Sequence, residues 1–370
     1  MSKEAKRSNL LTQGVQFLKY SVGNDISKQK FDSCISIIDN QHFVKIIATQ
    51  SFKNTPTGIK EFYRWVQSKI KGALPVVFVM EATGVYYEKL AWFLSKQNCY
   101  VSVVLPNKSK KYLQSLGIKT KNDKIDSKGL ARMGAEQKLI RWQAPEVKIL
   151  QLRNLTRHQE SLQVTKTSIN NQIKSLECSE HAEESVIRQQ KEIIQLIDEK
   201  IIETEKLIAN LMKGDPELAQ KTKQITKVKG IGILTLATII AETNAFNLFK
   251  NQRQLVSYAG YDVVENQSGK HVGKTKISKK GNSHIRRILY MPALTAVSCN
   301  EPMFKNLYER VYGRTRIKMK GYVAVQRKLL VLIYTLWKND AEFERDYLLR
   351  KQNGEYPEMQ SRSSSFCLAS

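Results

Sequence analysis

Apolar residues between positions 17 and 140 fall into short runs that are separated by polar turns. Runs of this length, bounded by Gly, Pro, Asn and Asp, are typical of β-strands. The run from Pro75 to Met80 is apolar without interruption, which indicates a strand buried on both faces. The predicted strands are Phe17–Gly23, Cys34–Asp39, Phe43–Ala48, Pro75–Met80 and Tyr100–Leu105.

Two stretches between these strands have the spacing of amphipathic helices. The first helix begins at Pro56 and Gly58, and the second spans Tyr86–Gln97. The apolar face of the first helix consists of Ile59, Phe62, Tyr63, Val66 and Ile70. Three successive strands followed by a strand–helix–strand unit predict a mixed sheet. We therefore expect an α/β domain over residues 17–143, preceded by an N-terminal arm over 1–16.

The next region has neither Gly nor Pro from Glu146 to Lys213, and its apolar residues recur at helical spacing. One helix of this length would extend on the order of 100 Å. Two long helices that fold back near Cys178–His181 are the preferred interpretation. They would form a coiled-coil spacer over residues 144–215, paired either within the chain or between protomers.

Residues 222–345 predict a compact all-α domain with one irregular basic loop, Val264–Ser283. Helices are expected at 284–299 and 320–339. The serine-rich tail, 355–370, has the composition of a disordered segment. The fold class is thus α/β plus all-α.

The net charge of the chain indicates what kind of partner it binds. The chain carries 60 Lys and Arg against 34 Asp and Glu, a formal net charge of +26. Such an excess favours a polyanion partner, and nucleic acid is the usual one. No segment is long and apolar enough to span a membrane, and the N-terminus lacks the apolar core of a signal peptide. None of the five cysteines forms a C-x-x-C pair, so a reducing cytoplasm is expected.

Four acidic residues stand out by their positions. Asp25 follows the first predicted strand, Glu81 follows the strand that ends at Met80, and Asp123 and Asp126 lie three residues apart in a helical segment. Clustered carboxylates repel one another, and hard divalent cations relieve that repulsion. Each residue also has a plainer interpretation: Asp25 as a turn cap, Glu81 as a solvated charge, and the other two as favourable charges at a helix N-terminus.

The C-terminal domain has two features suited to phosphate. Gly230 and Gly232 precede an apolar helix. Two interpretations are open: the glycines let the backbone approach a phosphate closely, or they form a simple tight turn. The basic loop is the second feature, with a solvated charged loop as its alternative. Its candidate nucleic-acid-binding residues are Lys270, Lys274, Lys276, Lys279, Lys280, Arg286 and Arg287. Ser268 lies among these cations, between Gln267 and Gly269, and from the residues alone the default interpretation is an ordinary turn serine.

These motifs resemble those of the DEDD transposases of the IS110 insertion-sequence family, with its IS1111 branch. The N-terminal resemblance rests on GNDISK (23–28), MEATG (80–84) and KNDKIDSK (121–128). The C-terminal resemblance rests on KGIGILTLATII, FKNQRQLVSYAG, NQSGKHVGK and ISKKGNSHIRRILY. Two small departures are Asn24, where an apolar residue is usual, and Ser127, where alanine is usual.

The resemblance implies an RNase H-like (RuvC-like) N-terminal domain in which Asp25, Glu81, Asp123 and Asp126 bind Mg²⁺, with Mn²⁺ as the alternative ion. It implies Ser268 as a nucleophile that forms a covalent link to DNA, in preference to Ser278 or Ser283. It further implies donor and target DNA, a structured non-coding bridge RNA, and a homo-oligomer, either dimer or tetramer. The expected location is the nucleoid in the cytoplasm of a bacterium or archaeon.

Two other functions fit the same residues. In a RuvC-like junction-resolving nuclease, metal-activated water would attack in place of Ser268. A non-enzymatic nucleic-acid scaffold would need no metal and would tolerate the loss of Asp25.

Overall fold

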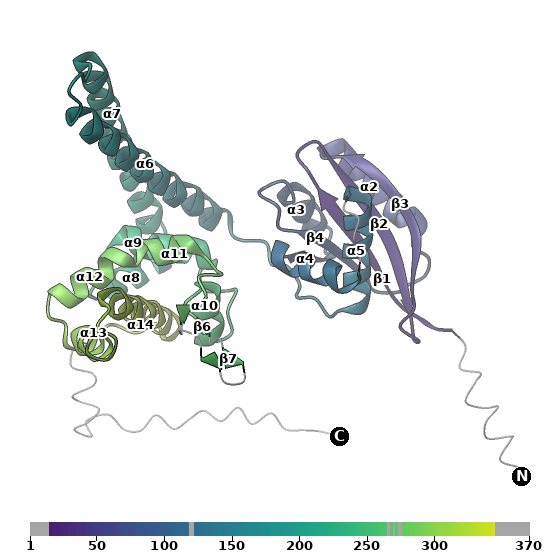
Figure 1. Cartoon of the computed structure of the whole chain (residues 1–370). Coiled ribbons are helices and arrows are strands. Elements are labelled where there is room, and N and C mark those ends of the chain that lie inside the picture. Colours follow the sequence, from purple (N-terminus) through teal and green to yellow (C-terminus); the bar gives the residue numbers. More distant parts are fainter. Residues whose placement is uncertain (1–14, 118–121, 265–266, 269–270, 273–275, 345–370) are drawn as a thin grey trace, which may run out of the picture. The chain divides into compact units, whose positions relative to one another are not determined.

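The computed structural model describes residues 15–117, 122–264, 267–268, 271–272 and 276–344. The chain divides into two compact units, residues 1–144 and 145–370, and each is described by itself (Figure 1). Nearly all of the predicted N-terminal arm and the whole predicted tail, 355–370, lie outside the described residues.

A five-stranded sheet forms the centre of the first unit. Its strands are β1 (Phe17–Ile26), β2 (Lys30–Asp39), β3 (Val44–Lys53), β4 (Val76–Glu81) and β5 (Tyr100–Val104). Their order is β3-β2-β1-β4-β5, with β1, β2 and β3 antiparallel in succession and β4 and β5 parallel to β1. The predicted mixed sheet is therefore confirmed, and this order with only β2 reversed is the RNase H-like arrangement.

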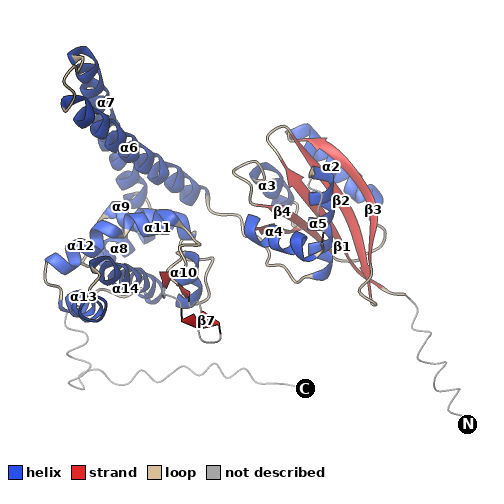
Figure 2. Cartoon of the chain, viewed as in Figure 1, coloured by secondary structure: helices blue, strands red, loops and turns tan. Residues whose placement is uncertain are grey.

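Helices cover both faces of this sheet (Figure 2). They are α2 (Pro56–Lys69), α3 (Glu88–Lys96), α4 (Pro106–Ser115) and α5 (Asp123–Glu136). Thr55 caps α2 by accepting a hydrogen bond from the Gly58 N–H at 3.2 Å. The largest core of the unit contains a group of aromatic rings packed edge to face or tilted: Phe31, Phe52, Phe62, Trp65 and Phe78. Leu130 and Met133 of α5 pack with Val79 in a separate cluster.

The second unit begins with the two predicted long helices, α6 (Val147–Glu177) and α7 (Glu184–Lys213). They turn back on each other at residues 178–183 and contact each other along their length, for example where Gln159 donates to Glu205 at 3.1 Å. The pairing described here is within one chain. Ile149 and Ile208 join the core of the helices that follow.

Seven further helices complete the described part of this unit (Figure 1). They are α8 (Pro216–Ile225), α9 (Ile233–Thr243), α10 (Gln252–Tyr258), α11 (Ser283–Ile288), α12 (Tyr290–Ser298), α13 (Pro302–Thr315) and α14 (Lys318–Asn339). The single helix predicted at 284–299 is wrong, because the helix is interrupted at Leu289. Pro292 has no N–H to donate to the carbonyl of Ile288 and thereby weakens helical continuity. The helix α13 was not predicted.

The irregular loop predicted at Val264–Ser283 is also wrong in part. Two short antiparallel ladders lie within it: β6 (Val263–Val264) with β9 (Lys276–Ile277), and β7 (Gln267–Ser268) with β8 (His271–Val272). This segment, residues 263–277, is called the serine hairpin below. Its many lysines obscure the alternation of β-branched residues that would have indicated strands.

Candidate active site

The sheet and α5 bring the four predicted carboxylates together. Asp25 lies within β1, and Glu81 is the last residue of β4. These strands are parallel neighbours, with Asn24 opposite Met80, so the two carboxylates occur at the same edge of the sheet. The prediction that the first strand ends at Gly23 is wrong, because β1 continues to Ile26 by pairing with β2.

Gly23 allows α5 to approach this edge. A Cβ at position 23 would lie 2.1 Å from the Ala131 nitrogen and 2.3 Å from the Ser127 oxygen, both of them backbone atoms of α5. Only glycine permits such a close contact between strand and helix. The helix starts beside the sheet as a result, with Asp123 and Asp126 in its first turn. Its N-cap is Asn122, whose Oδ1 accepts from the Ile125 N–H at 2.8 Å.

The pKa of Asp25 shows that these groups interact. Burial, followed by repulsion from Asp126, Asp123 and Glu81, raises the pKa of Asp25 from 3.8 to about 6. Asp32 contributes further repulsion, and it is the residue opposite Asp25 in the β1–β2 ladder. The predicted residues therefore form one electronegative cluster, in which an added negative charge is disfavoured.

Neighbouring side chains hold parts of the cluster in place. The Ser109 hydroxyl donates to Glu81 Oε2 at 2.6 Å, and the Thr83 hydroxyl donates to Glu81 Oε1 at 3.1 Å. The Lys30 ammonium lies 3.2 Å from Asp123 and 3.3 Å from Asp32. Hydrogen bonds to these two carboxylates raise the pKa of Lys30. Lys30 is thus a resident cation in this acidic cluster.

The cluster offers the right donor chemistry for a hard divalent cation, since its ligands are carboxylate oxygens. Among the described residues, however, no three His, Cys, Asp or Glu side chains lie close enough together to hold a metal ion. Asp32 was missed by sequence reasoning, although its side chain is only 5% exposed and accepts from Ser51 and Lys30. The signal available was its position in a strand that pairs with β1.

The predicted basic and serine residues belong to the second unit. Ser268 is in β7, where its backbone pairs with His271, and Lys270 and Lys274 lie outside the described residues. Lys276, Lys279 and Lys280 are exposed. The Arg286 guanidinium donates to the Ala259 carbonyl at 2.7 Å, and Arg287 pairs with Glu160 at 2.5 Å.

The two predicted phosphate-binding glycines differ in their surroundings. Gly230 has a φ of +90°, and a Cβ there would lie 2.7 Å from the Pro292 carbonyl, so packing against α12 already requires glycine. Gly232 is the N-cap of α9 and has open space around the position of a Cβ. Of the two, only Gly232 leaves room beside the helix N-terminus for a phosphate.

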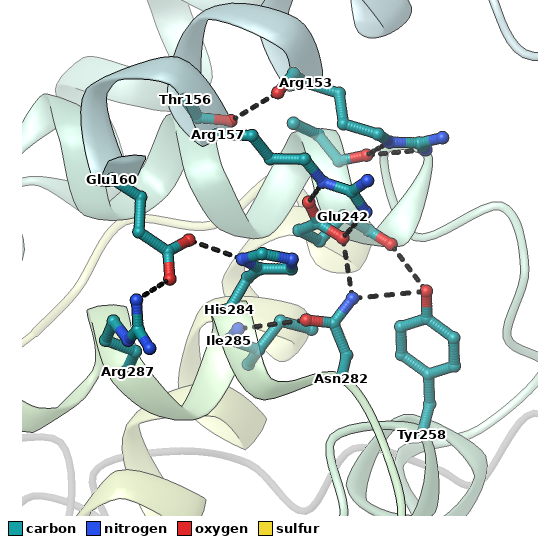
Figure 3. A network of polar contacts seen from close by, with 11 residues as sticks. Arg153, Thr156, Arg157, Glu160, Glu242, Tyr258, Asn282, His284, Ile285 and Arg287 are labelled. Atoms are coloured by element: carbon teal, nitrogen blue, oxygen red, sulfur yellow. Dashed lines mark hydrogen bonds and ion pairs between the residues drawn. The ribbon is translucent and has the colours of Figure 1, made fainter. Parts of the chain in front are cut away.

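A buried carboxylate, Glu242, contacts residues on both sides of the serine hairpin in the chain, Tyr258 and Asn282 (Figure 3). It is 2% exposed and accepts from Arg157 Nε at 2.7 Å, Arg157 Nη2 at 3.0 Å and Asn282 Nδ2 at 2.6 Å. Burial alone would raise the pKa of Glu242, but these hydrogen bonds outweigh it and lower the pKa. Asn282 also caps α11 through the Ile285 N–H, and its own N–H donates to the Tyr258 carbonyl at 2.7 Å.

Sequence reasoning missed Glu242, Arg157 and Asn282 as positioning residues. One signal was present, because Glu242 is the only acidic residue in the apolar helix ILTLATIIAET. A second group lies beside it, where Glu160 contacts both His284 and Arg287 (Figure 3). Together these contacts fix α11, directly after the hairpin, to α6 and α9.

Family models match both parts of the chain. One described as Transposase IS116/IS110/IS902 family matches residues 222–309, from α8 into α13. A DEDD transposase model of the IS110 type matches residues 22–176, which include the sheet, the four carboxylates and most of α6.

Relatives extend the likeness over most of the chain. The pilin gene-inverting proteins of Moraxella bovis and Moraxella lacunata are each 28% identical over 333 residues, covering 88% of this chain and 98% of theirs. Among solved structures, Thermus thermophilus RuvC matches with a TM-score of 0.26 and 11% identity, covering 32% of this chain and 93% of that chain.

The two domain matches, in this order on one chain, define a DNA transposase or recombinase, an enzyme that cleaves and rejoins DNA strands. The chain belongs to the IS110 family of transposases. No helix among the described residues is long and apolar enough to cross a membrane.

Proposed function

We propose that this chain is a divalent-metal-dependent, RNA-guided, site-specific DNA recombinase in which Ser268 is the nucleophile. The observation that carries the metal part is geometric: Asp25 and Glu81 lie at one edge of neighbouring parallel strands, and Asp123 and Asp126 are in the first turn of the helix that packs on Gly23. The names of the Moraxella relatives, which describe inversion of a gene, support a site-specific reaction.

Asp25, Glu81, Asp123 and Asp126 would hold Mg²⁺ or Mn²⁺ through carboxylate oxygens once their side chains turn toward the ion, since they are not close enough to hold it as they stand. A bound divalent ion would neutralise negative charge on the reacting phosphate and on the carboxylates themselves. Ser109 and Thr83 orient Glu81 by donating to its two oxygens. Lys30 would release Asp123 to turn toward the ion, because the exposed Lys30 ammonium would keep Asp32 as its partner.

Ser268 would attack a DNA phosphate. A bond forms between Oγ and phosphorus, the phosphorus–oxygen bond to one sugar breaks, and the proton lost by the serine replaces that bond on the leaving sugar oxygen. One ester replaces another, so the strand can later be rejoined without an outside energy source. The exposed Lys276, Lys279 and Lys280 near the hairpin base would balance charge on the phosphate.

A guide RNA and a homo-oligomer complete the proposal. The net charge of +26 suits RNA and DNA equally, so it supports a complex that contains both. The carboxylates and Ser268 belong to different compact units. In an oligomer, carboxylates and a serine from the same copy or from different copies would be available to act on one DNA strand.

Denaturation of a reaction containing end-labelled DNA, RNA and Mg²⁺ tests the serine assignment. We expect label on the wild-type protein and none on Ser268→Ala, while Ser278→Ala, the matched control, keeps the label. An adduct on another residue would overturn the assignment. Cleavage without any adduct would favour the rival nuclease, which uses water.

Strand exchange by Asp25→Ala and Glu81→Ala tests the carboxylate site. Both variants should fold, because removing a carboxylate relieves repulsion, and both should lose strand exchange in Mg²⁺ or Mn²⁺. Melting curves verify the folding. A fully active Asp25→Ala protein would exclude the proposed metal site.

A further inference from the structure

The turn between α13 and α14 carries a dense group of cations just beyond the C-terminal family match, which ends at residue 309. Five of the eleven residues from 310 to 320 are basic and none is acidic. The five, called the turn cations below, are Arg310, Arg314, Arg316, Lys318 and Lys320, and all are exposed.

These cations differ from the arginines near the serine hairpin. Arg157 and Arg287 pair with Glu242 and Glu160. In the part of the chain that the structure describes, no ion pair uses any of the turn cations. Unpaired cations at this density repel one another and attract an external polyanion.

A tyrosine stack holds this turn in a fixed shape. Tyr308 stacks on Tyr312 with ring centres 5.9 Å apart, and it packs on Tyr322 of α14 at 4.7 Å. Gly321 is buried because the Tyr308 ring occupies the place of a side chain, 2.6 Å from where a Cβ would be. Arg310 and Arg314, one helical turn apart, lie on the face of α13 away from these rings. The two helices therefore present the turn cations on a rigid support.

Gly313 lies between Arg310 and Arg314 in the last turns of α13. A glycine inside a helix destabilises that helix relative to alanine. No atom outside the helix lies within 4 Å of the position that a Cβ would take, so packing within the chain does not require glycine here. A bare helix surface between two arginines leaves room for a phosphate group to approach the backbone.

The cationic surface continues along α14. Arg327 and Lys328 are exposed two turns further on, and the distance from Lys318 to Lys328 along the helix is about 15 Å. This length matches several successive phosphates of a nucleic-acid strand. Ile317 and Met319, 48% and 51% exposed, lie between the cations at the turn.

We propose that the α13–α14 turn binds the phosphate backbone of duplex DNA, at a site separate from the serine hairpin. The chemistry is contact between Lys or Arg and phosphate, so binding there is independent of base sequence. A recombinase must retain both duplex arms after a strand is cut, and this surface would hold one of those arms. The choice of DNA over RNA rests on the proposed function.

The test compares two triple variants of the full chain. Arg310→Gln, Arg314→Gln and Lys318→Gln together neutralise the turn. The matched control is Lys60→Gln, Arg64→Gln and Lys69→Gln, which removes three exposed cations from α2. Affinity for a short duplex DNA of arbitrary sequence is measured over a range of salt concentrations in EDTA, and melting curves establish that both variants fold.

We expect the slope of log K against log salt to fall in magnitude by roughly 2 to 3 for the turn variant, since each lost phosphate contact contributes about 0.9. The control should lose much less, and Gly313→Ala should weaken binding while leaving α13 as stable or more so. Equal losses in the two triple variants overturn the proposal. A loss confined to an RNA duplex also overturns it, because it assigns the surface to RNA.

Failure of this proposal is distinct from failure of the proposed function. Binding in EDTA requires neither cleavage nor Ser268. A turn variant that binds DNA like the wild type rejects this surface alone. A wild-type protein that binds DNA through the turn but forms no serine ester rejects the nucleophile alone.

Discussion

At the scale of single residues, Asp25 is placed where its negative charge is unfavourable. Its pKa of about 6 lies above the ordinary value of 3.8, because of burial and then the neighbouring carboxylates. Well below pH 3.8 the group is protonated in both the folded and the unfolded chain. Between pH 4 and pH 6 the unfolded chain loses the proton first, so the free energy of unfolding falls as the pH rises.

Asp25→Asn should therefore stabilise the chain at neutral pH in the absence of divalent ions. We expect its melting temperature in EDTA to exceed that of the wild type by roughly 2–5 °C at pH 7.5, with the difference shrinking toward pH 4 and vanishing near pH 3. Mg²⁺ should narrow the gap at pH 7.5 by stabilising only the wild type. Equal differences at both pH values would show that charge repulsion at Asp25 is unimportant.

At the scale of elements, Glu242 connects α6, α9 and the start of α11. Glu242→Ala removes the acceptor of the half-exposed Arg157 and of Asn282, and their donors lose this hydrogen bond. Because Arg157 is half-exposed and can turn to solvent, we expect a loss of about 2–3 kcal/mol in the free energy of unfolding. The pKa of Glu242 is lowered, so this contribution is complete at neutral pH and is lost only in acid.

Glu203→Ala is the control for that measurement. It removes an acid of the same unit, whose partner Lys200 lies 2.8 Å away on the exposed surface of α7. Fully exposed pairs of this kind contribute little to the free energy of unfolding, because water and salt screen them. Urea unfolding compares the two variants. If the free energy of unfolding falls by the same small amount in both variants, Glu242 does not anchor the hairpin base.

Elements with a strong local pattern could be predicted from the sequence. The apolar run that ends at Met80 predicted β4 and placed Glu81 at its end, and the absence of Gly and Pro predicted α6 and α7. The grouping of Asp25 with Glu81, Asp123 and Asp126 came from family resemblance, because their spacing along the chain says little about their distance in space.

What could not be predicted depends on contacts between distant segments. Asp32 joins the carboxylate cluster only because β2 pairs with β1 in one particular register. Glu242 meets Arg157 and Asn282 only after α6, α9 and α11 have packed together. The short ladders of the serine hairpin have too few residues for a period to be recognised, and the lysines in and between them are typical of a solvated loop.

At the scale of the whole molecule, the net charge of +26 predicts strongly salt-dependent binding to nucleic acid. Proteins that make six to ten phosphate contacts lose about 10³–10⁵ in affinity between 50 and 200 mM salt, and we expect a loss of this order for duplex DNA. Binding titrations at several salt concentrations measure it. A flat dependence would argue against recognition dominated by the phosphate backbone.

The helix α7 suggests how the chain would self-associate. Ile197, Ile201 and Ile208 face α6 or the core. Next to them runs a second apolar stripe at helical spacing, which the single chain leaves exposed: Val186, Ile193, Leu196 and Leu207. A second copy that packed on this stripe would cover it, as expected for the predicted homo-oligomer.

Ile193→Glu with Leu196→Glu places two charges in the stripe. If copies associate through it, the double variant should shift toward the monomer in light scattering, because a buried unpaired carboxylate strongly disfavours an interface. Ile202→Glu is the control, since Ile202 is 53% exposed but lies on the opposite side of α7, about half a turn from the stripe. A wild-type protein that is monomeric with and without RNA would exclude self-association. A control variant that dissociates as readily as the double variant would place the interface elsewhere on the hairpin.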